Sequence, residues 1–227
     1  MEAPELVVHL MLALSLAATD RPLDRVLAVG CHADDLELGC GGTLLALTRA
    51  RPGLHVTWVV LAAGGARGDE ARASAEAFLA DAGSVDVRVH GFRDGFLPYV
   101  GGEVKEVFEG LKEARPDLVL THTRDDLHQD HRLACELAWN TFRDHLLLEF
   151  EIPKYDGDLG APNVFVPLDE PLVDEKLRLV REHHGSQAGK HWFDEELFRG
   201  LLRLRGMESA TRYAEAFTCR KLPLRLA

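Results

Sequence analysis

The sequence predicts an α/β fold with a mostly parallel, Rossmann-like sheet and helices on both of its faces. Two observations support this fold class. Short apolar segments alternate with helical segments along most of the chain, and this order is typical of parallel strands with helices packed on either side. The chain has 227 residues, of which 46% are hydrophobic, so it can bury a sizeable core. We therefore expect a single domain over residues 1–227.

Each element follows from its local pattern. The first strand is the apolar run RVLAVG, and the segment VDVRVHGF alternates with a period of two, as a half-buried strand does. The predicted strands are Arg25–Gly30, His55–Gly64, Val85–Phe92, Pro116–Thr123, Leu148–Ile152 and Val164–Leu168. The predicted helices are Gly41–Ala50, Asp69–Gly83, Glu103–Ala114, His131–Phe142, Pro171–His184 and Phe193–Arg205.

The N-terminal apolar segment Leu6–Ala18 needs a separate interpretation. It resembles the core of a signal peptide, but Glu2 and Glu5 precede it and no Lys or Arg does. The segment is also too short to span a bilayer. We therefore predict a buried first helix and no membrane partner.

Composition excludes some classes of protein. The formal net charge is -11 and there is no basic block, which argues against a nucleic-acid partner and fits a small neutral or cationic substrate. The four cysteines show no CxxC pairing, so we expect reduced thiols in a cytoplasmic protein. These features leave open whether the chain forms a homo-oligomer.

Acidic and imidazole side chains cluster where two predicted strands end. His32, Asp34 and Asp35 follow the first strand directly. If the strand order is 3-2-1-4, a ligand would bind between the first and fourth strands, beyond their carboxyl ends. The cluster at the end of the fourth strand consists of His122, Asp125, Asp126, His128, Asp130 and His131. We expect both clusters to meet in one crevice.

These side chains suit a catalytic metal site. Two histidines and one carboxylate are a common ligand set for zinc, with water in the open position, and the same set also suits iron or cobalt. Asp34 and Asp35 are neighbours and point in different directions. One can bind the metal while the other accepts a proton from the metal-bound water. The residues alone do not say which aspartate has which role.

Each feature also has a simpler interpretation. Asp34 and Asp35 could cap the following helix, and Asp130 could cap the helix at His131. Gly39–Gly42 could cradle a phosphate, although G-x-G-x-x-G is not matched; close approach of loop and helix to the crevice is the alternative. His122 could be a packing residue, and His128 and His131 could lie on a helix surface. The remaining histidines, interpreted as surface or lid residues, are His183, His184 and His191, and the loop Pro153–Pro162 could lie over the site.

Three segments resemble a known family. CHADDLELGCGGTL resembles the His-Pro-Asp-Asp motif of the PIG-L/LmbE-like zinc de-N-acetylases, with Ala33 in place of the motif's proline. HQDH, at His128–His131, resembles the family's His-x-Asp-His motif, and AAGGARGDEARASAEAF resembles its arginine-bearing segment. The resemblance implies a metal-dependent enzyme that removes an N-acetyl group from a glucosamine-type sugar conjugate.

The resemblance also implies roles for individual residues. His32, Asp35 and His131 would bind zinc, and Asp34 would be the general base. A protonated His128 would stabilise the oxyanion, with Asp130 tuning it. Substrate contacts would come from Arg67 and, less closely matched, from Arg72 and Asp94; a solvated helix face is the alternative for both arginines.

Two other functions stay open at this point. The chain could be an amidase that acts on a thiol-sugar or natural-product conjugate. It could also be a metal-binding or sugar-binding protein without catalysis. A binding protein would not need the non-ligand acid Asp34 or the histidine His128, and the sequence contains both.

Overall fold

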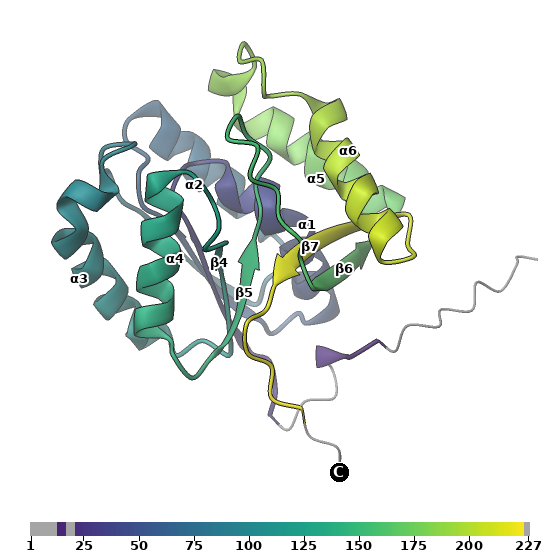
Figure 1. Cartoon of the computed structure of the whole chain (residues 1–227), viewed down its shortest axis with the longest axis horizontal. Helices are drawn as coiled ribbons and strands as arrows, with labels where there is room; N and C mark the ends of the chain where they lie inside the picture. Colours follow the sequence, from purple (N-terminus) through teal and green to yellow (C-terminus); the bar gives the residue numbers. More distant parts are fainter. Residues whose placement is uncertain (1–12, 17–20, 225–227) are drawn as a thin grey trace, which may run out of the picture.

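The sheet has seven strands in the order β3-β2-β1-β4-β5-β7-β6. The computed structural model describes residues 13–16 and 21–224 (Figure 1). The strands β1 to β5 pair in parallel, whereas β7 pairs antiparallel with both β5 and β6. The strands are β1 (Arg25–Gly30), β2 (His55–Val60), β3 (Ser84–Val89), β4 (Leu118–His122), β5 (Leu146–Phe150), β6 (Val164–Leu168) and β7 (Tyr213–Thr218). The predicted order 3-2-1-4 is confirmed, so strand order reverses between β1 and β4.

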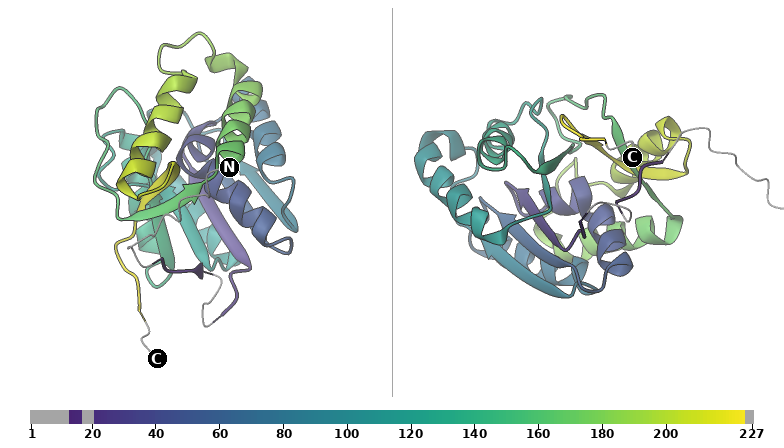
Figure 2. Two further views of the ribbon diagram at one scale, coloured as in Figure 1. Left: turned by 90° about the vertical axis from the view of Figure 1, so that its right-hand side faces the viewer. Right: turned by 90° about the horizontal axis from the view of Figure 1, so that it is seen from below.

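Helices cover both faces of this sheet, as predicted (Figures 1 and 2). Val26 and Ala28 of β1 belong to one core cluster, while Leu27 and Val29 belong to the other, because successive side chains point to opposite faces. The first cluster includes residues of α1, α2, α5 and α6, and the second includes residues of α3 and α4. The helices are α1 (Asp35–Ala50), α2 (Ala66–Phe78), α3 (Gly101–Leu111), α4 (Gln129–Thr141), α5 (Glu170–His183) and α6 (Glu195–Glu208). Short 3₁₀ turns are η2 (Leu97–Val100), η3 (Lys112–Ala114) and η4 (Gly185–Gln187).

The structure differs from the predicted elements most clearly in two places, at strand β7 and at the start of helix α1. Strand β7 was not predicted, because its sequence YAEAFT is rich in alanine and carries a central glutamate. Helix α1 begins at Asp35 and not at Gly41, so it starts directly after the acidic pair. The helix expected at Leu6–Ala18 lies mostly outside the described residues. Within the described part of the chain, no helix is long and apolar enough to cross a membrane, and all four cysteines are free.

The glycines of helix α1 allow close packing. A Cβ atom on Gly39 would lie 2.3 Å from the ring of Phe150, and one on Gly41 would lie 2.6 Å from the ring of Phe78. These glycines lie inside the helix and not at its N-terminus, where a phosphate would bind. The glycines therefore allow a close approach to helix α1, as the alternative interpretation expected, but the groups that approach are the core side chains Phe150 and Phe78 and not the crevice.

A buried ion pair crosses the middle of α1. The Lys176 ammonium donates to the Leu38 carbonyl and to Glu215 Oε1, both at 2.7 Å. Glu215 accepts in turn from the backbone N–H groups of Gly42 and Thr43, both at 2.7 Å. In a regular helix the Leu38 carbonyl would pair with the Gly42 N–H, and here each bonds to the ion pair. The pair thereby joins α1 to α5 and β7.

Candidate functional site

A cavity of about 390 Å³ opens at the carboxyl ends of β1 and β4. This is the position that the strand order predicts for a ligand. We call it the candidate cavity. The predicted site residues that line it are His32, Asp34, Asp35, Arg67, Asp94, His128 and His131. Arg72 does not line the cavity; it is exposed and its guanidinium lies 3.5 Å from the Val89 carbonyl, as expected for the solvated alternative.

Three side-chain atoms converge at the wall of this cavity. His32 Nδ1 lies 3.1 Å from His131 Nε2, and each of these nitrogens lies 3.4 Å from Asp35 Oδ2. For ligand bonds of about 2.0–2.2 Å, a tetrahedral site places neighbouring donor atoms about 3.3–3.6 Å apart. The three residues therefore fit a divalent metal ion in both chemistry and spacing. They come from the β1–α1 connection, the first residue of α1 and the first turn of α4.

Neighbouring carboxylates orient the two imidazoles. His131 Nδ1 lies 2.9 Å from Asp126 Oδ2. Asp126 is buried, with 1% of its surface exposed. His32 Nε2 lies 3.3 Å from Asp130 Oδ2 and 3.1 Å from Asp94 Oδ1. A ring nitrogen that donates to a carboxylate leaves the other nitrogen free as a ligand. Each ring therefore presents the correct nitrogen to the centre of the site.

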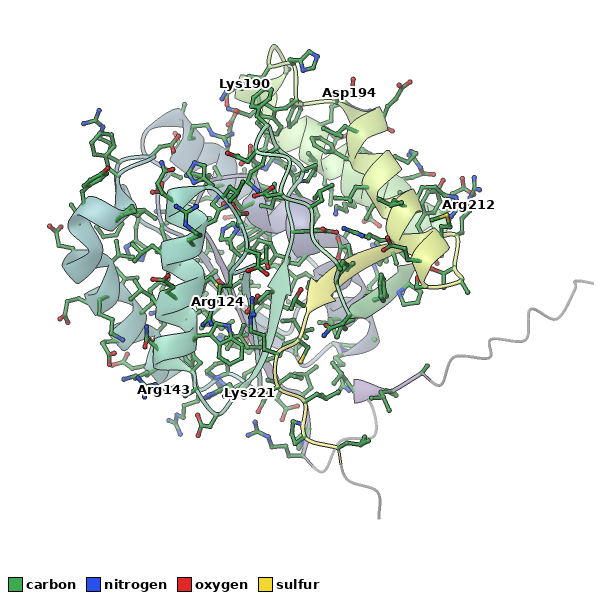
Figure 3. The ribbon with its side chains drawn as sticks, in the orientation of Figure 1. Arg124, Arg143, Lys190, Asp194, Arg212 and Lys221 are labelled. Atoms are coloured by element: carbon green, nitrogen blue, oxygen red, sulfur yellow. The ribbon has the colours of Figure 1, made fainter. Side chains whose placement is uncertain are left out.

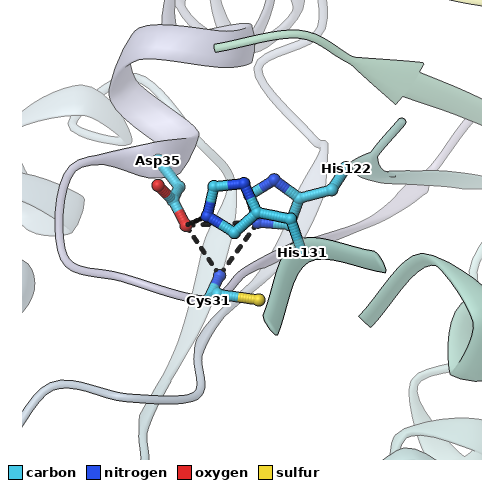
Figure 4. A group of neighbouring side chains, drawn as sticks. All are labelled: Cys31, Asp35, His122 and His131. Atoms are coloured by element: carbon cyan, nitrogen blue, oxygen red, sulfur yellow. Dashed lines mark hydrogen bonds and ion pairs between the residues drawn. The ribbon is translucent and has the colours of Figure 1, made fainter. Parts of the chain in front are cut away.

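Asp35 is held in the ionised form. Burial by itself would raise the pKa of Asp35, but the imidazoles of His131, His122 and His32 together lower it well below its usual value. Its Oδ2 also accepts from the backbone N–H group of Cys31 at 2.9 Å (Figure 4). The backbone N–H group of His32 donates to the same oxygen at 2.7 Å. The backbone between β1 and α1 thus holds the negatively charged Oδ2 of Asp35 at the site.

His122 is a further member of the site; the sequence analysis placed it in the strand-end cluster, with packing as the alternative. It is fully buried, and its ring stacks on that of His131 with centroids 3.8 Å apart. His122 Nε2 also lies 3.1 Å from Asp35 Oδ2 (Figure 4). Burial and then the adjacent His131 lower the pKa of His122 to about 4, so the ring is neutral. His122 packs as expected and in addition supports the carboxylate of Asp35.

Asp34 also lines the cavity, but its partner differs from those of Asp35. It occupies the N-cap position of α1, but its side chain makes no capping hydrogen bond. Its Oδ2 instead lies 3.0 Å from Arg67 Nη2. Burial, followed by the charge of Asp35, raises the pKa of Asp34, while Arg67 acts against that rise. Asp34 is therefore a buried carboxylate with an increased affinity for a proton, at the wall of the cavity.

A buried histidine and glutamate lie behind Arg67. His184 was interpreted as a surface or lid residue, but it is fully buried, with Nε2 3.1 Å from Glu37 Oε1. His184 Nδ1 lies 3.5 Å from Arg67 Nη1. Glu37 and His184 are 147 positions apart, so no local pattern could have joined them. The structure thus adds a chain of contacts that runs from Glu37 through His184 and Arg67 to Asp34.

His128 caps helix α4. Its Nδ1 accepts a hydrogen bond from the Asp130 backbone N–H at 3.3 Å, so the ring hydrogen of the neutral form is on Nε2. Burial, then the charges of His131 and His32, lower the pKa of His128. The structure therefore favours a neutral hydrogen-bond donor over the protonated ring that we expected. The Asp130 carboxylate accepts from the backbone N–H groups of Gly95 and Leu97 and contacts His32, not the His128 ring.

Comparison with known proteins identifies the family. The family model of PIG-L, described as GlcNAc-PI de-N-acetylase, matches residues 27–142. A diacetylchitobiose deacetylase from Thermococcus kodakarensis is 28% identical over 84% of this chain and 81% of its own length.

Solved structures show the same fold. A conserved protein from Thermus thermophilus aligns with a TM-score of 0.71 and 23% identity, over 90% of this chain and 97% of its own. An N,N′-diacetylchitobiose deacetylase from Pyrococcus horikoshii aligns with a TM-score of 0.69 and 22% identity, over 86% and 83%. A 4-carboxy-2-hydroxymuconate hydratase from Pseudomonas putida aligns with a TM-score of 0.70 and 19% identity, over 90% and 100%, so the fold alone does not set the reaction. The family match contains both sequence motifs and the three converging residues His32, Asp35 and His131, and it spans more than half of the chain, so the chain belongs to the PIG-L family.

Proposed function

We propose that this protein is a metal-dependent hydrolase that removes the N-acetyl group from a GlcNAc-type sugar conjugate. The observation that carries the proposal is the convergence of His32 Nδ1, Asp35 Oδ2 and His131 Nε2, with the separate carboxylate of Asp34 at the same cavity. Family membership and the likeness to a diacetylchitobiose deacetylase support the choice of an acetylated amino sugar.

His32, Asp35 and His131 would hold the metal ion, and we expect zinc, although this ligand set also suits iron or cobalt. A bound divalent ion polarises the amide carbonyl and acidifies the attacking water. Side chains and backbone groups of this protein would orient the ligands and transfer the proton. Asp126 and Asp130 keep the two imidazoles in the required orientation, and the backbone N–H groups of Cys31 and His32 hold the Asp35 carboxylate.

Asp34 is the general base. Its carboxylate takes a proton from the attacking water, whose oxygen forms a new bond to the amide carbon. His128 Nε2–H donates a hydrogen bond to the developing oxyanion. Cleavage of the C–N bond then releases acetate, and the amine nitrogen of the sugar takes the proton back from Asp34. Arg67 holds Asp34 in place through its 3.0 Å contact.

Metal analysis and a substrate panel test the proposal. Protein purified without chelators or immobilised-metal resin should carry about one divalent ion per chain. It should release acetate from N-acetylglucosamine conjugates, lose this activity on chelation and regain it with added zinc. Absence of metal, with no rescue by added zinc, iron or cobalt, would contradict the proposal. Turnover of a thiol-sugar or natural-product amide alone would favour the amidase alternative.

A further inference from the structure

The guanidinium of Arg67 is held from outside the candidate cavity as well as from its wall. We propose that Glu70 and Ser186 form a clasp that positions Arg67 and, through Arg67, the general base Asp34. Glu70 and Ser186 do not line the cavity, so the rate would depend on two residues that do not touch the substrate. The inference rests on the proposed function, because that function assigns the proton transfer to Asp34.

Helix α2 places Arg67 and Glu70 beside each other. The two residues are three positions apart at the start of the helix, and side chains at this spacing share a face. Arg67 Nη1 donates to Glu70 Oε2 at 2.9 Å, while Arg67 Nη2 lies 3.0 Å from Asp34 Oδ2. The guanidinium therefore bridges one carboxylate at the wall of the cavity and a second carboxylate outside it.

The planar guanidinium makes this bridge directional. Its nitrogen atoms lie in one rigid plane, so a partner that fixes Nη1 also fixes the direction in which Nη2 points. The rest of the Arg67 side chain is a flexible stem, and 26% of the side chain is exposed to water. If Nη1 were released, Nη2 would sample positions away from Asp34. The Asp34 carboxylate would then lose its defined position beside the attacking water.

Glu70 is itself fixed by a residue that is distant in the chain. Ser186 lies in η4, 116 positions away from Glu70. Its backbone N–H donates to Glu70 Oε1 at 2.8 Å, and its hydroxyl donates to Glu70 Oε2 at 2.7 Å. Burial by itself would raise the pKa of Glu70, but the hydrogen bonds from Ser186 and Arg67 lower it below its usual value. Glu70 is therefore an ionised acceptor with both oxygens bonded.

The hydroxyl of Ser186 has a complete set of partners. It donates to Glu70, and it accepts from Gln187 Nε2 at 2.7 Å and from Arg67 Nη1 at 3.4 Å. A hydroxyl group offers one donor and two acceptor positions, so all three are used. Gln187 is 5% exposed and lines the cavity. The clasp therefore joins helix α2 to a segment that forms part of the cavity wall.

The connection between α5 and α6, residues 184–194, carries these contacts. Lys190 of this connection, labelled in Figure 3, also lines the candidate cavity. His184, at the start of the connection, is fully buried and lies 3.5 Å from Arg67 Nη1. Arg67 thus contacts this connection as well as Glu70. This is the contact pattern of a positioned side chain and not of a solvated helix face.

Glu70→Gln tests the inference most directly. The amide keeps an acceptor for Ser186 but loses the charge that holds Arg67. We expect kcat for acetate release from N,N′-diacetylchitobiose to fall by about 10- to 30-fold, with KM and metal content unchanged, since a partly exposed hydrogen bond between charged groups corresponds to about that factor. Ser186→Ala should lower kcat in the same direction and by no more than Glu70→Gln.

Glu76→Gln is the matched control, because Glu76 lies on the same helix, is exposed and does not line the cavity. It should leave kcat and KM unchanged. Unchanged kcat in both Glu70→Gln and Ser186→Ala would overturn the inference. A fall in kcat that is matched by loss of the metal ion would also overturn it.

A double-mutant cycle with Arg67→Lys separates positioning from a merely structural role. Lysine has no planar fork, so it cannot transmit the position of Glu70 to Asp34. In the Arg67→Lys background, Glu70→Gln should therefore lower kcat by less than about twofold. An equal loss of kcat in both backgrounds would show that Glu70 acts without Arg67 and would overturn the inference.

NMR provides a measurement that does not depend on turnover. In protein labelled with ¹⁵N-arginine, a guanidinium held at both Nη atoms rotates slowly and keeps separate Nη resonances, whereas a free one gives averaged resonances. We expect separate Arg67 resonances, identified by their absence in Arg67→Lys, in the unaltered protein and in Glu76→Gln. They should be averaged in Glu70→Gln.

The outcomes distinguish the inference from the proposed function. Averaged Arg67 resonances in the unaltered protein would overturn the inference, whether or not acetate is released. Separate resonances without acetate release from any N-acetylated amino sugar would contradict the proposed function, while the clasp itself would stand.

Discussion

Helix α1 carries two clusters of buried charge, and they differ in how completely their hydrogen bonds are made. The cluster in the middle of the helix is the pair of Lys176 and Glu215, which are 1% and 3% exposed. Both Glu215 oxygens accept from backbone N–H groups, and the ammonium bonds to one of them and to a carbonyl. This closed arrangement offers no atom to a ligand.

The cluster at the start of the same helix is open. Asp35 is as buried as Glu215, at 4% exposed, but imidazoles surround it and no Lys or Arg pairs with it among the described residues. His122 Nδ1 and Glu37 Oε2 are buried without a hydrogen-bond partner. Buried charge is costly unless it is paired or binds a metal. The comparison indicates that the middle of α1 uses charge to join elements, whereas its start keeps the buried charge that the proposed metal ion would need.

The largest effect should follow from removing the central carboxylate of the open cluster. Asp35→Ala leaves His32 and His131 without their third partner, so we expect loss of the metal ion and of detectable acetate release. Metal content and activity of the purified variant check this. Asp144→Ala is the control, since the Asp144 side chain is 92% exposed. An Asp35 variant with normal metal content would show that the ligand set is wrong.

Asp34→Asn tests whether the adjacent carboxylates have separate roles. Asp34 contacts Arg67 and not the metal ligands, so the variant should keep its metal ion. The rate should fall by about 10²–10⁴, the usual contribution of a general base. Metal analysis and kcat measured on the same preparation decide the question. If both aspartate variants lost the metal equally, Asp34 would not be the base.

The closed cluster should respond through stability instead. Lys176→Met leaves Glu215 buried without its cation, and we expect the free energy of unfolding to fall by about 3–5 kcal/mol. Denaturant unfolding measures the change. Arg178→Met is the matched surface control: Arg178 pairs with Glu182 and its side chain is 47% exposed, so the loss should be below about 0.5 kcal/mol. A similar loss in both variants would remove the distinction between buried and surface pairs.

His128→Ala should affect the rate and spare the metal ion. Loss of one oxyanion donor costs about 2.7–4 kcal/mol in kcat, or about 10²–10³ in rate. The variant also loses the cap of α4, which should lower stability by about 0.5–2 kcal/mol. His128→Asn can restore the cap without placing a donor at Nε2, and it should recover stability but not kcat. Near-normal kcat in His128→Ala would mean that His128 is a bystander.

The smallest effect should come from His184, which acts through Arg67. His184→Gln can still donate toward Glu37 but should hold Arg67 less well, so we expect kcat to fall by about tenfold with unchanged metal content. A double-mutant cycle with Arg67→Lys measures the coupling between the two residues. Full additivity of the two changes in kcat would show that His184 only fills space.

Local sequence pattern was sufficient for the first half of the fold. The strands near Arg25–Gly30 and Leu118–His122 are apolar runs with clear boundaries, and the two acidic and imidazole clusters directly follow them. Once the strand order was taken as 3-2-1-4, these clusters had to lie at one edge of the sheet. The sequence by itself thus determined the fold class, the place of the candidate site and the residue types in it, because each depends on short-range pattern and on a general rule of sheet topology.

Only the tertiary structure decided which atoms meet. It oriented His32 through Asp94 and Asp130, brought His184 to Glu37, and joined Lys176 to Glu215 beside α1. These partners lie 39 to 147 positions apart in the chain. Such contacts have no local signature in the sequence, because the residue type of a histidine, lysine or glutamate does not show whether its side chain is buried or exposed. Burial and pairing arise only when separate elements pack, and that packing distinguishes the open cluster from the closed one.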